Sequence, residues 1–295
     1  TIEEATLRLG IQVVRSAYYG KLHTSDRFGS LSGGTFVCGS TNFNVVANGG
    51  MTAACVAFGD VYPEECFDGI SKAIQSLGYM LPKFEPDGAW EEGPNYWDYT
   101  TQYLARMVSA LETSCGTDYT ILSHPGVNNT PYYAMYLDSY QGINNFSDSA
   151  RGMQWNTPQL GAFGKYMNEK AFTYMRYAQI TERSCQPSLY DILWFDESAK
   201  QEKSVLPLDN TVSGLDMISI REDWDKSDSL YLGAHGGKNN VYHAQYDGGS
   251  YVFDLLGERW AVDLGMDDAT YVGNPASSVY RGRAEGHNML VFNPD

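Results

Sequence analysis

The hydrophobic pattern of this chain changes once, and the change separates a helical part from a β part. Before about residue 200, apolar residues recur at helical spacing, as at Phe67, Ile70, Ile74 and Leu77. This spacing is typical of amphipathic helices. After Pro207, apolar and polar residues alternate or form short apolar runs between glycine and aspartate turns, which is typical of antiparallel strands. The pattern therefore predicts a set of helices followed by an antiparallel sheet.

The predicted helices follow one another as antiparallel pairs, and most are bounded by proline, glycine or asparagine. Helices are predicted at residues 2–19, 41–59, 63–81, 97–115, 129–138, 158–168, 170–183 and 187–195. Strands are predicted within residues 215–224, 229–237, 249–257, 258–265 and 287–293. An all-helical first part is the simplest interpretation, because no strand pattern of weight occurs before residue 200.

The boundary between the two parts falls in the charged stretch DESAKQEK. We therefore predict a helical domain over residues 1–205 and an antiparallel β domain over residues 206–295. A β part of about 85 residues is small for a two-sheet sandwich and leaves open sheet edges. We expect further chain segments, or a second copy in a homo-oligomer, to complete the sheet.

Composition fits a packed globular chain and argues against two classes of partner. Of the 295 residues, 43% are hydrophobic and 19% charged, which excludes a disordered chain. The net charge of −16 makes a nucleic-acid groove or an anionic membrane surface an unexpected partner. No apolar run is long enough to span a membrane, and no signal-peptide pattern begins at Thr1. Because the sequence begins at Thr, we expect a processed or trimmed product. The five cysteines lack the spacing of a zinc knuckle.

The candidate polar residues of the β part lie in the stretch Val241–Gly265, with His287 as a further candidate later in the chain. Side chains two apart leave the same face of a strand, so His243 and Gln245 are predicted to point to one side. Imidazole and carboxylate groups suit a divalent metal, and His243, Asp263 and His287 could together bind one. A turn-rich hairpin with its polar groups in water or in local hydrogen bonds remains the alternative.

A second group of candidate residues lies in an acidic and aromatic loop before the helix predicted at 97–115. Asp87, Glu91 and Glu92 precede Tyr96 there. Two carboxylates a set distance apart act as acid and base in glycoside hydrolases, although acidic residues at a helix start also stabilise the helix. Tyr96 could serve as a Brønsted acid or base, although most tyrosines are simply packed.

Four blocks of the sequence resemble the heparinase II/III-like family of polysaccharide lyases, in family order and at family-like separations. They are NFNVVANGGMTA (42–53), PDGAWEEGPNYWDYTTQYLARMVSALET (86–113), HAQYDGGSYVFDLLGERWAVDLG (243–265) and RAEGHNMLVFNP (283–294). The resemblance covers nearly the whole chain. It implies a toroid of α/α helix pairs followed by an antiparallel β-sandwich, in agreement with the helices and strands predicted from the pattern.

The resemblance implies a lyase that cleaves a uronic-acid polysaccharide, a glycosaminoglycan or alginate, by β-elimination. Such a reaction needs a group that neutralises the uronate carboxylate, a base for the C5 proton and an acid for the leaving oxygen. Tyr96 and His243 match the family's catalytic tyrosine and histidine. The family's asparagine–histidine pair falls on Phe43 and Asn44, so Asn44, with Asn42 as a substrate contact, is expected to neutralise the carboxylate.

The resemblance also implies a structural zinc ion, further substrate contacts and a periplasmic or secreted location. The zinc-ligand positions match Gln245, Asp263 and His287, and a glutamine is a weaker zinc ligand than the histidine of the family pattern. Glu92 and Trp97 are expected to contact substrate, with the Trp97 ring stacked on a sugar.

Two other functions remain open. The departures from the family pattern at Phe43, Asn44 and Gln245 fit a carbohydrate-binding protein that keeps the fold and has lost the chemistry. A glycoside hydrolase that uses Glu91 or Glu92 is the third possibility. Its products would lack the unsaturated sugar that β-elimination leaves.

Overall fold

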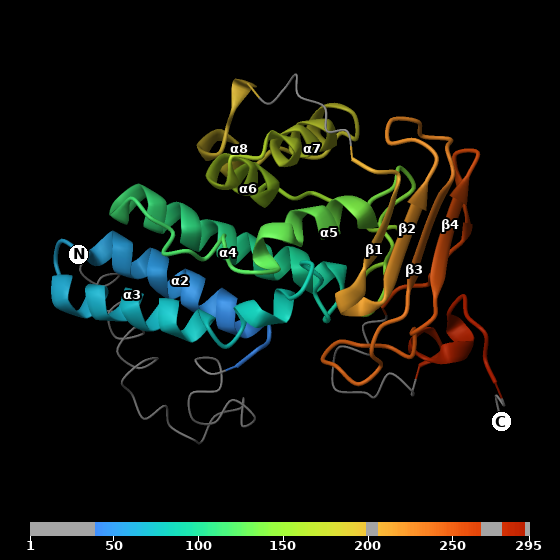
Figure 1. Cartoon of the computed structure of the whole chain (residues 1–295), viewed down its shortest axis with the longest axis horizontal. Helices are drawn as coiled ribbons and strands as arrows, with labels where there is room; N and C mark the ends of the chain where they lie inside the picture. Colours follow the sequence, from blue (N-terminus) through green and yellow to red (C-terminus); the bar gives the residue numbers. More distant parts are fainter. Residues whose placement is uncertain (1–38, 199–205, 267–278, 293–295) are drawn as a thin grey trace. The chain divides into compact units, whose positions relative to one another are not determined.

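A computed structural model describes residues 39–198, 206–266 and 279–292 (Figure 1). The helix predicted at residues 2–19 lies outside these ranges. The chain divides into two compact units, one made of Thr1–Lys83 and Tyr99–His124, and the other of Phe84–Asp98 and Pro125–Asp295. Among the described residues, no helix combines the length and the apolar character needed to cross a membrane.

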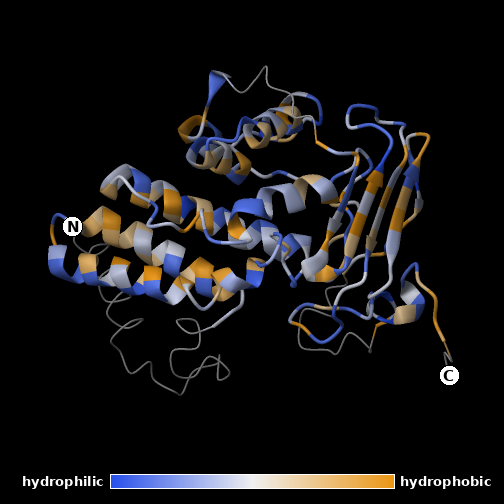
Figure 2. Ribbon diagram, viewed as in Figure 1, coloured by the Kyte–Doolittle hydropathy of each residue, from blue (hydrophilic) through white to orange (hydrophobic). Residues whose placement is uncertain are grey.

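The first unit is built from α2 (Asn42–Phe58), α3 (Pro63–Leu77) and the larger part of α4 (Pro94–Cys115). α3 begins at a proline, whose fixed φ suits the first helical position, and the glutamates in its first turn complement the helix dipole. Hydrophobic and hydrophilic residues form separate bands around α3 in Figure 2. The core between α2 and α3 contains Met51, Cys55, Phe58, Tyr62, Cys66 and Ile70.

The helices of the second unit confirm most of the remaining predicted helical segments. They are α5 (Thr130–Leu137), α6 (Gln159–Met167), α7 (Lys170–Thr181) and α8 (Leu189–Leu193). α6 and α7 are separate helices because Asn168 adopts a left-handed conformation that ends α6. The side chain of Glu169 then accepts a hydrogen bond from the backbone of Ala171 and caps α7. Short 3₁₀ turns are η1 (Leu81–Phe84), η2 (Val127–Asn129), η4 (Ser213–Leu215), η6 (Tyr280–Gly282) and η7 (Ala284–Gly286).

The strands of the second unit form one antiparallel sheet with neighbours in sequence order. They are β1 (Asp209–Val212), β2 (Met217–Arg221), β3 (Tyr231–His235), β4 (Tyr251–Leu255) and β5 (Glu258–Ala261). β1 was not predicted, and the other strands lie within predicted segments. The predicted combination of helices with an antiparallel sheet is therefore confirmed, whereas a closed toroid and a two-sheet sandwich remain predictions.

The buried face of the sheet lies against α5, as Figure 1 shows. Residues of β2 and β3 alternate in burial, and Arg221 of β2 pairs with Tyr231 of β3 in the sheet register. The hydroxyl of Tyr231 donates a hydrogen bond to the carbonyl of Tyr136 in α5 at 3.0 Å. Polar side chains, and not apolar packing alone, thus fix the sheet against the end of this helix.

The strand predicted at residues 287–293 is wrong for the part that the structure describes. Residues 287–292 are irregular and follow η6 and η7. Leu290 and Phe292 are 80% and 83% exposed, so these two side chains do not pack against any described strand. An apolar run becomes a strand only where it finds a partner edge and a surface to pack on.

Candidate functional site

A tight loop in the second unit positions Tyr96, which lies in the first turn of α4. Gly88 has a φ of +87°, and a Cβ there would lie 2.4 Å from the backbone nitrogen of Thr130. The hydroxyl of Thr130 donates to the Gly88 carbonyl at 2.6 Å and accepts from the Trp97 indole at 2.8 Å. Asp87 accepts a hydrogen bond from the Ser213 hydroxyl at 2.7 Å. The loop is therefore anchored to α5 and to the turn after β1.

Tyr96 and His243, the two predicted catalytic residues, are in direct contact. Their rings stack with centroids 3.6 Å apart and an interplanar angle of 17°. Tyr96 is 8% exposed, and the side chain of His243 is 23% exposed. Residues from the start of α4 and from the loop before β4 thus meet at one place that solvent can reach.

Asp148 holds the imidazole of His243, and sequence reasoning did not identify it. The Asp148 carboxylate lies 3.0 Å from His243 Nδ1 and accepts from Gln245 Nε2 at 3.3 Å. The backbone N–H of Asp148 also donates to the His243 carbonyl at 3.1 Å. In the tautomer whose Nδ1 proton points toward Asp148, Nε2 is the nitrogen of His243 that can accept or donate a proton.

The segment around His243 is a loop, so the expectation of a strand at residues 243–247 is wrong. His243 has a φ of +63°, a left-handed conformation that a strand does not contain. His243 and Gln245 nevertheless share a partner, since both contact the Asp148 carboxylate. The carboxylate of Asp247 accepts from the backbone of Ser147 and ties the two loops together a second time. Hydrogen bonds, and not strand geometry, orient these side chains.

The predicted substrate contacts Glu92 and Trp97 are buried in the second unit. The Trp97 indole packs edge-on against Trp155 at 5.2 Å and donates to Thr130. Glu92 accepts from the Trp90 indole at 3.2 Å. This burial disagrees with the expected stacking of Trp97 on a sugar, because a fully buried ring has no face to offer.

Asn42 and Asn44 belong to α2 in the first unit, and both are buried. The amide nitrogen of Asn44 donates to the carbonyls of Gly39 at 2.9 Å and Ser76 at 3.1 Å. Asn48 donates to the Asn44 side-chain oxygen at 3.0 Å and to the Ser76 hydroxyl at 2.8 Å. In this structure the Asn44 amide joins α2 to α3, and its expected contact with a uronate carboxylate remains a prediction.

The expected zinc ligands lie together only in part. Asp263 accepts from His287 Nδ1 at 2.8 Å, from the Ser250 hydroxyl at 3.3 Å and from the Gly265 backbone at 2.8 Å. Buried atoms without a partner are Nε2 of His287 and Oε1 of Gln245. Among the described residues, no three His, Cys, Asp or Glu side chains are arranged to hold a metal. Gln245 falls outside those residue types, and the unpartnered His287 Nε2 and Gln245 Oε1 are atoms that can bind a metal, so the expected zinc site remains a prediction.

Hydrogen bonding to Asp263 governs the protonation of His287. Burial disfavours the charged imidazole, but the hydrogen bond and the charge of Asp263 outweigh it and raise the pKa of His287 above its ordinary value. The pair thus makes a charge-assisted contact inside the β part.

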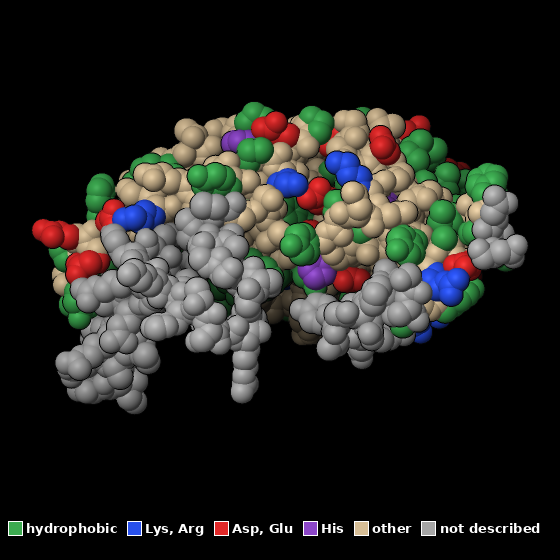
Figure 3. Space-filling model, turned by 90° about the horizontal axis from the view of Figure 1, so that it is seen from below, with side chains coloured by type: hydrophobic (Ala, Val, Ile, Leu, Met, Phe, Trp, Pro, Cys, Tyr) green, Lys and Arg blue, Asp and Glu red, His purple; other side chains and the backbone are tan. Residues whose placement is uncertain are grey.

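The distribution of charged side chains on the surface does not favour long-range attraction of an anionic polymer. On the face drawn in Figure 3, basic and acidic side chains of the described residues are interspersed and form no basic stripe. With a net charge of −16, the chain can bind a polyanion only through local sites.

Solved structures identify the fold, although no protein-family model and no curated sequence matches the chain. A crystal structure of heparinase III is similar, with a TM-score of 0.62 and 13% identity over 99% of this chain and 47% of that chain. Heparan sulfate lyase HepC from Pedobacter heparinus, as a mutant, has a TM-score of 0.58 and 16% identity over 78% of this chain and 34% of that chain. The chain thus spans between a third and a half of these proteins, and it shares the fold of that part of the heparinase III and heparan sulfate lyase structures.

Proposed function

We propose that the chain carries the acid–base pair of a polysaccharide lyase and cleaves a uronic-acid polysaccharide by β-elimination. The observation that supports this proposal most directly is the stacked contact between Tyr96 and His243. These residues belong to separate sequence blocks, 86–113 and 243–265. The shared fold with heparan sulfate lyase structures supports the same reaction class.

In the proposed reaction, one of the two side chains removes the C5 proton and the other protonates the departing oxygen. Electrons from the C5–H bond form the C4–C5 double bond as the C4–O bond breaks. The product has an unsaturated sugar at its new non-reducing end. Two Brønsted groups in contact can serve both steps at one sugar, and each such group contributes about 10²- to 10⁴-fold to a rate. Tyr96 as base with His243 as acid, and the reverse, are both open.

Asp148 is proposed as the residue that positions His243. A carboxylate on Nδ1 fixes the ring orientation and the tautomer, and it stabilises the imidazolium that forms when Nε2 takes a proton. No step of the proposed reaction is assigned to a metal. We also propose that Asn44 neutralises the substrate carboxylate. For the complete protein, we propose an α/α toroid followed by a β-sandwich, and a periplasmic or secreted location.

The test measures unsaturated ends by their ultraviolet absorbance. Purified protein is incubated with heparan sulfate, hyaluronan and alginate. We expect absorbance to rise with at least one of them, and Tyr96→Phe and His243→Ala to lower the rate by at least about 100-fold. Tyr99→Phe is the matched control, because Tyr99 is an exposed tyrosine three positions along the same helix.

The assignment fails if no substrate in the panel gives unsaturated ends, or if Tyr96→Phe turns over as fast as Tyr99→Phe. Circular dichroism of each variant separates lost chemistry from lost folding. A binding protein without activity is favoured by the burial of Asn44, and it would bind a polysaccharide without producing absorbance. A glycoside hydrolase would release new reducing ends without absorbance. The buried contact of Glu92 with Trp90 argues against Glu92 in that role and leaves Glu91 as the candidate.

A further inference from the structure

A cationic recess lies in the second unit between the loop after α5, the end of α7 and the loop after β2. Its cavity volume is about 20 Å³, and it opens to solvent. Arg183, Arg221 and Lys226 line it, together with the carboxylates of Asp223 and Asp254 and the rings of Trp224 and Tyr140. The lining thus has more cations than carboxylates, in a chain whose net charge is −16.

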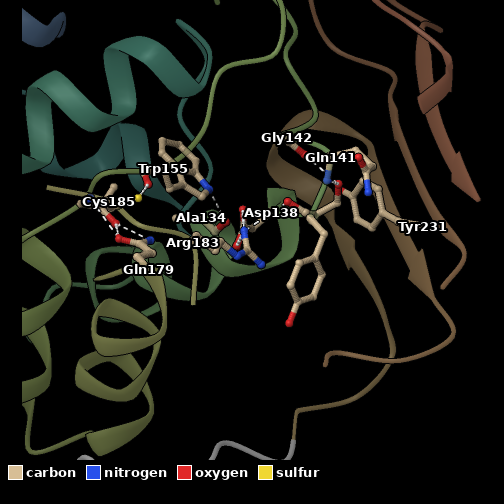
Figure 4. Close-up of polar contacts among 12 residues, drawn as sticks. Ala134, Asp138, Gln141, Gly142, Trp155, Gln179, Arg183, Cys185 and Tyr231 are labelled. Atoms are coloured by element: carbon tan, nitrogen blue, oxygen red, sulfur yellow. Dashed lines mark hydrogen bonds and ion pairs between the residues drawn. The ribbon is translucent and has the colours of Figure 1, made fainter. Parts of the chain in front are cut away.

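Carboxylates neutralise most of the cations around the recess. Arg183 pairs with Asp138 at 2.7 Å, a contact that Figure 4 shows beside the loop carrying Gln141. Lys226 pairs with Asp223 at 3.3 Å, and Arg259 pairs with Asp254 at 2.7 Å. Each of these pairs leaves little net charge for a ligand.

Arg221 is the exception, because it makes no ion pair with any described residue. The residue is 7% exposed, and its Nε is buried without a hydrogen-bond partner. The guanidinium lies 3.5 Å from the centroid of the Trp224 ring. Burial lowers the pKa of Arg221 from its usual value. The charge of Asp138 acts on Arg221 without a direct ion pair. A guanidinium buried without a directly bonded carboxylate is costly, and a cation–π contact offsets only part of that cost.

A structural role at the end of α5 does not account for this charge. The Tyr136 carbonyl accepts from Arg221 Nη2 at 3.1 Å, but it also accepts from the hydroxyls of Ser219 and Tyr231. A carbonyl oxygen has two lone pairs, and the two hydroxyls can fill both. The carbonyl therefore has its partners without Arg221.

We propose that this recess binds a small oxyanion, a sulfate or carboxylate group, with Arg221 as its main charge and Lys226 as a second donor at the rim. Arg221 Nη1 is the guanidinium nitrogen left for such a group, because Nη2 donates to the Tyr136 carbonyl and Nε is buried. Lys226 is 67% exposed at its side chain and can turn from Asp223 toward the anion. The aromatic rings of Trp224 and Tyr140 offer apolar walls for a sugar that carries the group.

Equilibrium dialysis with radiolabelled inorganic sulfate at constant ionic strength tests the site. We expect saturable binding of one sulfate per chain. Since a hydrogen bond to a charged group contributes about 1.5–3 kcal/mol, Arg221→Met should weaken binding by more than about tenfold. Lys226→Gln should weaken it about threefold, the effect of an exposed charge. Lys72→Gln is the matched control, because Lys72 is also a partly exposed lysine paired with an aspartate on its own segment.

Absence of saturable sulfate binding overturns the proposal, as does equal binding by folded Arg221→Met. If Arg221→Met fails to fold, Lys226→Gln and Trp224→Leu decide, and unchanged affinity in both overturns it. The source of the anion follows from competition by a sulfated and a desulfated heparan tetrasaccharide. If the sulfated tetrasaccharide competes more strongly, the anion is a sulfate ester. If both tetrasaccharides compete equally, the anion is a sugar carboxylate. If neither competes, the ligand is a free inorganic anion. Dialysis measures binding alone, so the result is independent of whether the lyase proposal survives.

Discussion

Replacing Asp148 by asparagine separates the positioning of His243 from its chemistry. The change keeps the size of the side chain and an oxygen that can accept from His243 Nδ1, but it removes the negative charge. A hydrogen bond to a charged group contributes about 1.5–3 kcal/mol, and loss of a residue that orients a functional imidazole commonly lowers activity about 10- to 100-fold. Since 1.4 kcal/mol corresponds to tenfold, the two estimates agree.

Initial rates of double-bond formation on the best polysaccharide of the panel measure this effect. We expect Asp148→Asn to lower kcat about 10- to 100-fold with little change in KM, because Asp148 acts on the ring and not on the sugar. Asp68→Asn is the control, since it removes the charge of an aspartate in a partly exposed ion pair with Lys72. The reasoning is refuted if folded Asp148→Asn keeps kcat within about threefold of the wild type, or if only KM changes.

Further predictions concern stability and its dependence on pH. Asp191 pairs with the buried guanidinium of Arg176 at 2.6 Å, so Asp191→Ala should lower the free energy of unfolding at pH 7 by about 3 kcal/mol in urea titrations. Burial opposes ionisation, but hydrogen bonds from Arg176 hold the pKa of Asp191 below its usual value, so this contribution should disappear as pH falls through that lowered pKa. Gly88→Ala should cost about 2–3 kcal/mol, because its φ is +87° and its Cβ would meet Thr130, and an unchanged melting temperature would contradict this geometry. Asn44→Ala should lower the melting temperature by several degrees through its lost hydrogen bonds, and a soluble, equally stable variant would show that the α2–α3 network contributes little.

Sequence periodicity was sufficient for the elements that bury one continuous face. The helix α3 and the strands β2 and β3 follow the predicted segments because each has an apolar stripe or alternation that packing uses directly. By contrast, α5 is buried on nearly every side, and no residue of β5 is fully buried. β1 was missed because Asp209–Val212 contains only one apolar residue and pairs with β2 through its backbone. The run at 287–292 had the composition of a strand but no partner edge among the described residues.

The candidate site was predictable only where a motif marked it. Tyr96 and His243 were named from family-like blocks, and nothing in local periodicity indicates that their rings touch. Asp148 lies in a loop without regular spacing, in the run NNFSDS, and only the fold brings it to His243. The burial of Trp97 was also not predictable from the sequence, since an aromatic residue at a helix start can face either solvent or a core.

The left-handed backbone at His243 makes the identity of residue 243 informative in related sequences. With a φ of +63°, any residue with a Cβ has a higher backbone energy here than glycine, by about 1–2 kcal/mol. In a relative whose imidazole has no function, substitution of this histidine by glycine would increase stability, and asparagine would also be tolerated. Retention of histidine at this position would then distinguish relatives that use the ring from relatives that keep only the fold.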